Sequence, residues 1–109
     1  MQYLKTALCV NNSELIRKSI KKLLENSGFR VVGEADNGLT AIKLYDELKP
    51  DIVIMDIAMP ELDGIQTLKK IKKVDKEARI IIISSSSHER KVQEAMIEGA
   101  IGFIIWPPS

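Results

Sequence analysis

Asp56 is the residue with the clearest chemical potential, because it directly follows an unbroken apolar run at residues 52–55. A short, wholly apolar run is typical of a strand that is covered on both faces in a parallel sheet. A carboxylate at the end of such a strand can accept a phosphoryl group or help to hold a divalent cation. The plain alternative is that the aspartate only caps a loop or a helix.

Other polar or unusual side chains follow further apolar runs in the same way. The run at residues 4–10 is followed by two asparagines, the run at 80–83 by four serines, and the run at 101–105 by Trp106. In open parallel sheets the functional crevice lies beyond the carboxyl ends of the strands, at the topological switch point. We therefore expect one site built from Asn11, Asn12, Asp56, Ile57, Ala58, Ser84, Ser85 and Trp106.

The segments between these runs have the spacing of amphipathic helices. Strands are predicted at residues 4–10, 30–35, 52–55, 80–83 and 101–105, with the half-polar 30–35 at an edge. Between them, apolar residues recur at helical intervals, as in Leu15, Ile16, Ile20, Leu23 and Leu24. Asn11 to Ser13, Asn37 and Asp63 offer helix-capping chemistry, and Gly28 and Gly99 are expected helix ends. The pattern predicts an α/β chain with a doubly wound, five-stranded parallel sheet in a (βα)₄β arrangement, forming one domain over residues 1–109.

Composition narrows the function classes. The net charge is +1 and 45% of the residues are hydrophobic, so charge gives no case for nucleic acid or an anionic membrane. No apolar run is long enough to span a bilayer. The single cysteine, Cys9, lies within an apolar run and is interpreted as a small buried hydrophobe, which fits a reducing cytosol.

The segment DIVIMDIAMPELDG, residues 51–64, resembles the receiver domain of bacterial response regulators, the family that includes the stand-alone chemotaxis receivers. Support comes from EADNG at residues 34–38, from the paired serines at 84 and 85, and from EGA at residues 98–100 before a strand that ends in X-Pro. The resemblance covers residues 6–107. It implies the flavodoxin-like strand order 2-1-3-4-5.

The resemblance also implies roles for individual residues. Asp56 matches the phosphoacceptor, and the backbone carbonyl of Ala58 matches a ligand of Mg²⁺. Ser84 matches the hydroxyl that hydrogen-bonds the phosphoryl group, and Phe103 matches the aromatic switch residue. The Trp106–Pro107 peptide bond is expected to be cis, as is usual at this place in the family.

Three positions depart from the family pattern. Asn11 and Asn12 occupy the place of the paired acidic residues, and Trp106 occupies the place of the lysine. Opposite charges in contact near a protein surface are worth about 4 kcal/mol, so losing these carboxylates should weaken Mg²⁺ binding at Asn12, Asp56 and Ala58 by several kcal/mol. An indole has one neutral N–H donor and cannot replace an ammonium group beside an acyl phosphate.

The predicted function is therefore an atypical receiver domain of a two-component or phosphorelay response regulator, signalling by phosphate-independent protein contacts. The alternative is a working Mg²⁺-dependent phosphoacceptor, phosphorylated on Asp56 by a histidine kinase. In either case the chain is not an enzyme beyond self-phosphorylation and dephosphorylation on Asp56, and no other cofactor is expected. The expected partners are a histidine kinase or another signalling protein in the bacterial cytoplasm, with no direct contact to nucleic acid or membrane.

Several residues have a plain structural interpretation as well. Phe103 could be packed core, the serines after Ser84 a flexible loop, and His88 a solvated loop residue. Lys69, Lys70, Lys72, Lys73 and Lys76 are interpreted as a solvated helix face. A flavin- or nucleotide-binding role is disfavoured because residues 11–15 contain no glycine, and an aspartate-based phosphatase because Ala58 stands where a second aspartate is usual.

The family continues with a fifth helix, which this sequence does not contain. A three-turn helix would bury several hundred Å² of apolar surface, worth roughly 5–10 kcal/mol. We therefore expect an uncovered sheet face. In the complete assembly, we expect this face to be covered either by a segment of a longer protein, which also carries an output domain, or by another chain in a homodimer.

Overall fold

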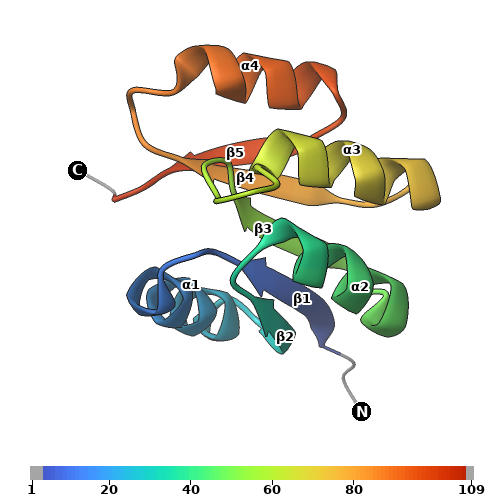
Figure 1. Cartoon of the computed structure of the whole chain (residues 1–109). Helices are drawn as coiled ribbons and strands as arrows, with labels where there is room; N and C mark the ends of the chain where they lie inside the picture. The colour runs from blue at the N-terminus through green and yellow to red at the C-terminus, as the bar shows by residue number, and fades with distance from the viewer. Residues whose placement is uncertain (1–3, 108–109) are drawn as a thin grey trace.

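The computed structural model describes residues 4–107 (Figure 1). Strands and helices alternate along the chain, as predicted, and each strand differs from its predicted range by one residue at one end. The elements are β1 (Lys5–Val10), α1 (Glu14–Asn26), β2 (Phe29–Ala35), α2 (Gly38–Leu48), β3 (Ile52–Asp56), α3 (Gly64–Val74), β4 (Ile80–Ser84), α4 (Glu89–Ile97) and β5 (Gly102–Ile105).

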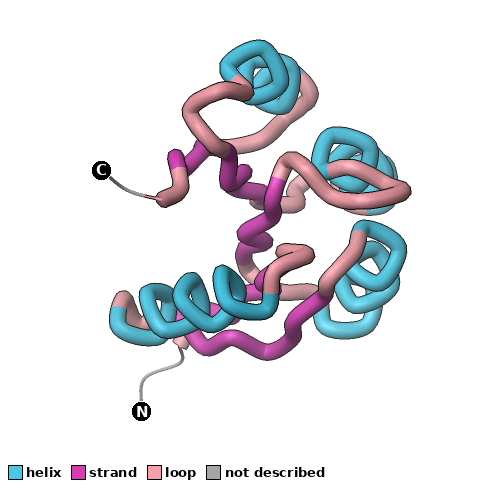
Figure 2. The backbone as a smooth tube through the Cα atoms, turned by 60° about the vertical axis from the view of Figure 1, so that its left-hand side comes forward, coloured by secondary structure: helices cyan, strands magenta, loops and turns pink. Residues whose placement is uncertain are grey.

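The five strands form one parallel sheet in the order β2-β1-β3-β4-β5. This confirms the predicted fold class and places half-polar β2 at an edge. β3 lies at the centre, between β1 and β4, so the strand that ends in Asp56 is paired on both sides. Figure 2 shows that α1 lies on one side of the sheet and α2, α3 and α4 on the other.

Side-chain caps fix the starts of the first three helices. The side chains of Ser13 and Asn37 accept hydrogen bonds from backbone N–H groups in the first turns of α1 and α2. Asp63 forms a reciprocal capping box with Gln66 at the start of α3, which confirms its predicted capping role. His88 precedes α4 without a side-chain cap.

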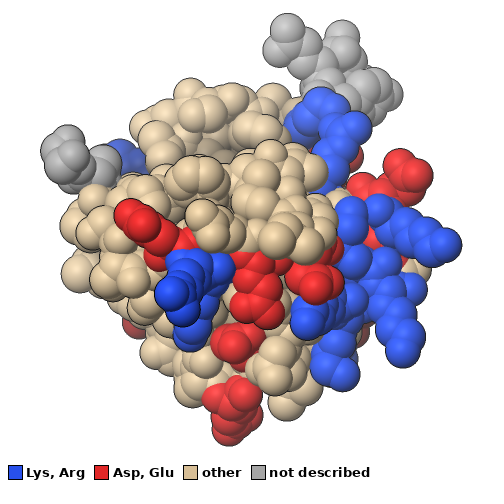
Figure 3. Space-filling view, turned by 90° about the horizontal axis from the view of Figure 1, so that it is seen from above, with Lys and Arg blue, Asp and Glu red and all other residues tan. Residues whose placement is uncertain are grey.

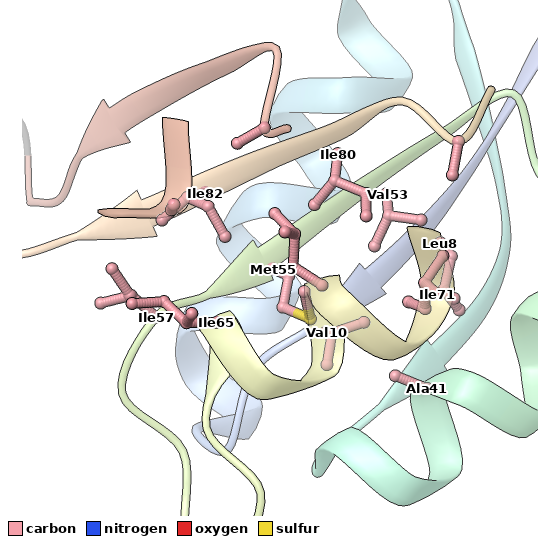
Figure 4. Close-up of a cluster of buried hydrophobic side chains, with 14 of the residues drawn as sticks. Leu8, Val10, Ala41, Val53, Met55, Ile57, Ile65, Ile71, Ile80 and Ile82 are labelled. Atoms are coloured by element: carbon pink, nitrogen blue, oxygen red, sulfur yellow. The ribbon is translucent and has the colours of Figure 1, made fainter. Parts of the chain in front are cut away.

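Alternation along the strands divides the core into two clusters, one on each side of the sheet. Leu8, Val10, Val53, Met55, Ile80 and Ile82 pack toward the side of α2, α3 and α4, where Figure 4 shows them with Ile65 and Ile71 of α3. The cluster on the α1 side contains Ala7, Cys9, Ile20, Leu24, Ile52, Ile54 and Ile83. Cys9 is fully buried there, as its apolar surroundings predicted.

The helical pattern overstated how much of α1 is buried. Leu15 and Leu23 are 77% and 49% exposed, although both belong to the predicted apolar series. They lie on the flank of α1 opposite Arg17 and Lys21, whose side chains pair with Glu34 of β2. The ion pairs direct that flank toward β2 and leave the leucine flank uncovered.

The α1 side of the sheet is only partly covered. Figure 2 shows α1 on this side, and among residues 4–107 no other helix lies there over β4 and β5. Ile81, Ile104 and Trp106 are partly buried at the margin of the α1-side cluster. The described residues thus have the uncovered sheet face that we expected from the sequence. None of the helices within residues 4–107 is long and apolar enough to cross a membrane.

Candidate functional site

The register of the sheet brings the predicted site residues to one edge. Val10 pairs with Met55, Asp56 with Ile83, and Ser84 with Ile105. The residues that follow these pairs therefore leave the sheet side by side, with Asp56 in the middle. Two backbone bonds continue the alignment: Ile57 N–H donates to Ile83 O at 2.9 Å and Trp106 N–H donates to Ser84 O at 2.9 Å.

Asp56 is half-buried at the end of the central strand. Its Oδ1 accepts a hydrogen bond from the N–H of Ala58 at 3.2 Å. Burial raises the pKa of the Asp56 carboxyl, while the N–H groups of Ala58 and Ile57 and the charge of His88 act in the opposite direction. The carboxylate is thus held in place by its own loop, in a setting where an extra positive charge would stabilise it.

The loop after Asp56 is folded back onto the strand. Gly64 N–H donates to Ile57 O at 2.9 Å, and a Cβ on Gly64 would lie only 2.7 Å from the Cα of Ile57. Glu61 has a φ of 64°, in the left-handed region. The motif therefore has a structural reason: glycine at 64 permits the close approach, and Asp63 caps the helix that starts there.

The two asparagines have different environments. Asn11 is 2% exposed, and its Oδ1 accepts the N–H of Ser13 at 2.9 Å. Its backbone carbonyl accepts a bond from Arg17 Nη1 at 2.6 Å. Asn12 is exposed. The helix cap is therefore Ser13 and not Asn11, whose amide oxygen stabilises the turn that precedes α1.

The serines at the end of β4 and in the loop that follows it also differ in their exposure. Ser84 is 1% exposed, and its hydroxyl donates to Ser85 O at 3.0 Å. In the β4–α4 loop, residues 85–88, Ser85 Oγ lies 2.8 Å from Ser87 Oγ and 3.3 Å from His88 Nδ1, so the three side chains form a hydrogen-bonded cluster. His88, interpreted as a solvated loop residue, is the last residue of this loop and is partly exposed, and its charge lowers the pKa of the Asp56 carboxyl.

Trp106 follows β5 in the place expected from the resemblance, and the Trp106–Pro107 peptide bond is cis, as predicted. The indole is partly buried against the apolar cluster on the α1 side of the sheet. The side chain at this position therefore contributes packing on that side of the sheet.

Phe103 is not packed core, so that interpretation is wrong: its side chain is 51% exposed. Strand β5 is at the sheet edge, where it pairs with β4 alone. Phe103 instead lines a groove of about 660 Å³ between α4 and β5. The groove is mainly apolar and is lined by Ser85, Ser86, Glu89, Val92, Gln93, Met96, Ile97, Phe103 and Ile105.

The lysines of α3 have partners nearby. Lys69 lies 3.8 Å from Glu98, and Lys72 Nζ donates to the carbonyls of Lys76 and Ala78 at 2.8 and 3.1 Å. Figure 3 shows lysine and arginine side chains gathered at one side of the molecule with acidic side chains among them. Lys69, Lys70, Lys73 and Lys76 are exposed and Lys72 is partly exposed, which supports the interpretation as a solvated helix face.

The residues at the site fit a divalent cation poorly. Mg²⁺ prefers oxygen ligands and relies on carboxylates, waters and phosphate oxygens. Asp56 is the single carboxylate among the predicted ligands, because Asn12 and the Ala58 carbonyl are neutral and the Asn11 amide oxygen is already bonded. Within residues 4–107, no three His, Cys, Asp or Glu side chains come together as a metal-binding group.

Comparison with known proteins gives a consistent picture. The sequence profile of the response regulator receiver domain matches residues 7–108. The chain is 44% identical to the chemotaxis protein CheY of Thermotoga maritima over 103 residues, which are 94% of this chain and 86% of that protein. It is 46% identical to the chemotaxis protein CheY of Bacillus subtilis over 100 residues, 92% of this chain and 83% of that protein.

The fold is also similar to solved structures. The complex of CheX and CheY with BeF₃ and Mg²⁺ from Borrelia burgdorferi contains a chain that superposes with a TM-score of 0.90 at 34% identity, covering 96% of this chain and 80% of that one. The response regulator domain of Thermotoga maritima CheB superposes with a TM-score of 0.89 at 38% identity, covering 96% and 80%.

Proposed function

The chain belongs to the response regulator receiver domain family, and we propose that it is an atypical receiver that signals through protein contacts without requiring phosphate. The single observation that carries this proposal is that Asp56 is the only carboxylate among its predicted metal ligands. The proposal concerns a signalling module of a two-component or phosphorelay system, with no enzymatic activity beyond self-phosphorylation and dephosphorylation on Asp56.

The first argument is electrostatic. Phosphoryl transfer to a carboxylate requires positioning and cancellation of the charge on the transferring group. Asn11 and Asn12 bring no negative charge to attract a cation, and Trp106 brings no positive charge to meet a phosphoryl oxygen. A phosphoryl dianion beside half-buried Asp56 would therefore be poorly compensated.

The second argument is structural. The Asn11 amide oxygen is bonded to Ser13 N–H, and the Trp106 indole packs against the α1-side cluster. Both residues have roles in holding the fold. These structural roles support the proposal that the fold is adapted to Asn11 and Trp106 at these two positions.

The test is incubation with a small-molecule phosphodonor and Mg²⁺, followed by intact mass measurement. The proposal expects the unmodified mass, with Asp56→Asn as the matched control. Stoichiometric phosphate on the wild-type chain that is missing from Asp56→Asn would show a working phosphoacceptor.

A working phosphoacceptor is the second candidate, and one observation favours it. Asp56 is only half-buried, and Asn12 and Ala58 beside it are exposed, so a cation with several waters could approach. The Borrelia complex includes BeF₃ and Mg²⁺ with a chain of the same fold. Titrating Mg²⁺ while following the fluorescence of Trp106, the single tryptophan, separates the two candidates, because the first expects no response at millimolar Mg²⁺.

Two surfaces are proposed for partners. The groove between α4 and β5 offers apolar side chains to a histidine kinase or another signalling protein. The uncovered α1 side of the sheet, with Ile81, Ile104 and Trp106, is proposed to pair with a second copy of the chain or with a segment joined to an output domain. The mass in solution, measured by light scattering, tests the homodimer. A stable particle with the mass of one chain would contradict it. The proposed compartment is the bacterial cytoplasm, with no direct contact to nucleic acid or membrane.

A further inference from the structure

A hollow of about 350 Å³ lies between α2 and α3, the two helices that Figures 1 and 2 show side by side. This α2–α3 hollow is lined by Ile42, Lys43, Tyr45, Asp46, Ile71 and Val74. None of these residues belongs to the candidate site around Asp56 or to the groove between α4 and β5. The α2–α3 hollow is therefore a separate feature of the surface, and the candidate site gives it no role.

Apolar side chains at the hollow are open to solvent on both helices. Val74 of α3 is 64% exposed, and Ile42 of α2 is half-buried. Leu39 precedes Ile42 by three residues, so it lies on the same flank of α2, and it is 60% exposed. An apolar strip thus continues from the hollow along α2. Exposed apolar surface with a polar rim is typical of a protein-binding site.

The polar groups inside the hollow already have partners. Tyr45 is buried, and its hydroxyl donates to Asp75 Oδ2 at 2.7 Å. The carboxylate of Asp46 lies 3.9 Å from the ammonium group of Lys49. The hydroxyl and the two carboxylates are thus engaged within the chain, so a ligand of this hollow meets mainly apolar surface and the remaining cations.

The lysines of α3 point to two different flanks of the helix. Lys69 lies 3.8 Å from Glu98 at the end of α4. Lys70 precedes Val74 by four residues, so it lies one turn away on the flank toward α2. Among residues 4–107, neither Lys70 nor Lys43 on the opposite wall forms an ion pair. The hollow therefore has an uncompensated ammonium group on each of its two walls.

We propose that the α2–α3 hollow is a docking site for an acidic peptide segment of a partner protein. The segment inserts one large apolar side chain between Ile42 and Val74 and places carboxylates beside Lys43 and Lys70. The volume is at the low end of the range for binding pockets, which suits a side chain or two and not a whole domain. The inference goes beyond the proposed function, because it adds a contact surface that includes neither Asp56 nor the groove between α4 and β5.

Charge complementarity decides the choice of occupant. A basic segment would bring like charges together at Lys43 and Lys70, and a neutral one would leave both ammonium groups uncompensated. The apolar anchor supplies affinity, because well-packed side chains in a pocket carry most of the binding energy of an interface. The carboxylates supply specificity, and their contribution should decrease as the salt concentration rises, since both lysines are exposed.

The test begins with a random library of short displayed peptides, which is selected for binding to the folded full chain. Peptides that also bind Val74→Ser are removed first, because this variant loses exposed apolar surface without any change in charge. We expect the retained peptides to be rich in Asp and Glu and to share a large apolar residue. In NMR spectra of the chain, such a peptide should shift the backbone amides of Ile42, Lys43 and Val74.

Charge reversal then tests the rim with the same retained peptide. Lys43→Glu combined with Lys70→Glu should weaken binding about tenfold or more, because an exposed ion pair contributes up to about fivefold and each reversal adds repulsion. Lys22→Glu combined with Lys91→Glu is the matched control, since it makes the same change in net charge at exposed positions on α1 and α4. The control should leave the affinity within about twofold of the wild type.

Several outcomes would overturn the inference: an empty pool, retained peptides without acidic residues, shifted amides outside the α2–α3 hollow, or equal loss of affinity in the two double variants. A dimer of the chain that dissociates in Val74→Ser would show that a second copy is the occupant instead. Binding to anionic vesicles that the Lys43 and Lys70 reversals abolish would show a lipid surface. No step involves phosphate, Mg²⁺ or Asp56, so this inference and the proposed function can fail separately.

Discussion

Gly64 lies against the backbone of Asp56, so close that a Cβ at position 64 would clash with the Asp56 carbonyl oxygen. The contact joins the start of α3 to the end of β3. It also explains why a glycine stands eight residues after the phosphoacceptor position without needing any direct chemical role.

Gly64→Ala should therefore destabilise the protein and disturb the site. The neighbour is backbone and cannot move like a flexible side chain, so we expect a loss of about 1–3 kcal/mol in the free energy of unfolding. Urea unfolding measures it. Gly102→Ala is the matched control, because nothing lies within 4 Å of the Cβ it would add. Equal midpoints for the two variants would contradict the packing argument.

Asn12→Asp should strengthen Mg²⁺ binding about tenfold or more, because it adds a second carboxylate at an exposed position beside Asp56. Titration followed by Trp106 fluorescence gives the affinity. Asn26→Asp, at the far end of α1, makes the same change in net charge away from the site. An equal gain in both variants would show that the effect comes from general charge.

Trp106→Lys combined with Asn12→Asp should make Asp56 easier to phosphorylate, because it restores both the cation and a carboxylate to the site. Intact mass after incubation with a phosphodonor and Mg²⁺ is the measurement, and Asn12→Asp alone is the control. Removing the partly buried indole should cost about 1–2 kcal/mol of stability. Phosphate incorporation no higher than in the wild type would count against the charge argument.

Cys9 should not react with a thiol reagent in the folded protein. Burial in the α1-side cluster raises the pKa of its thiol to about 12, so little thiolate exists in mildly alkaline buffer. Reaction should become fast in urea, where the side chain is exposed. Rapid labelling under native conditions would show that the α1 side of the sheet opens readily.

Tyr45 donates a hydrogen bond of 2.7 Å from its hydroxyl to Asp75 Oδ2, linking α2 to the end of α3. This bond is the main cause that lowers the pKa of the Asp75 carboxyl. A carboxyl whose pKa is lowered by folding stabilises the protein above its unfolded pKa, and the contribution is lost as the pH falls through its folded pKa. Tyr45→Phe should thus destabilise the protein near neutral pH and less so well below pH 3.8. Urea midpoints at the two pH values test it, and an equal loss at both would contradict the linkage.

Apolar runs and turn residues were sufficient to predict the order of strands and helices. Buried parallel strands such as β3 are predicted by their wholly apolar composition. Asp63 is predicted as a cap because it stands just before the helical pattern of the third helix. The strand order 2-1-3-4-5 came from the family resemblance, because spacing alone does not determine which strands are neighbours. The bounds shifted by one residue because pairing, rather than composition, decides where a strand ends.

The exposure of individual apolar residues was harder to predict. Leu15 and Leu23 fit a helical pattern, but periodicity does not say how wide a stripe of the helix is covered. Phe103 lies on an edge strand, where the sequence does not distinguish a buried side chain from an exposed one. The partial burial of His88 could not be predicted either, because the path of the β4–α4 loop depends on contacts between residues distant in sequence.

Ser85 belongs to two places at once: it anchors the loop beside Asp56 and it forms part of the wall of the groove between α4 and β5. Whatever event moves this residue, the shape offered to a partner changes with it. If the groove binds a partner as proposed, a stimulus that moves Ser85 would change the loop beside Asp56 and the surface that the partner contacts at the same time.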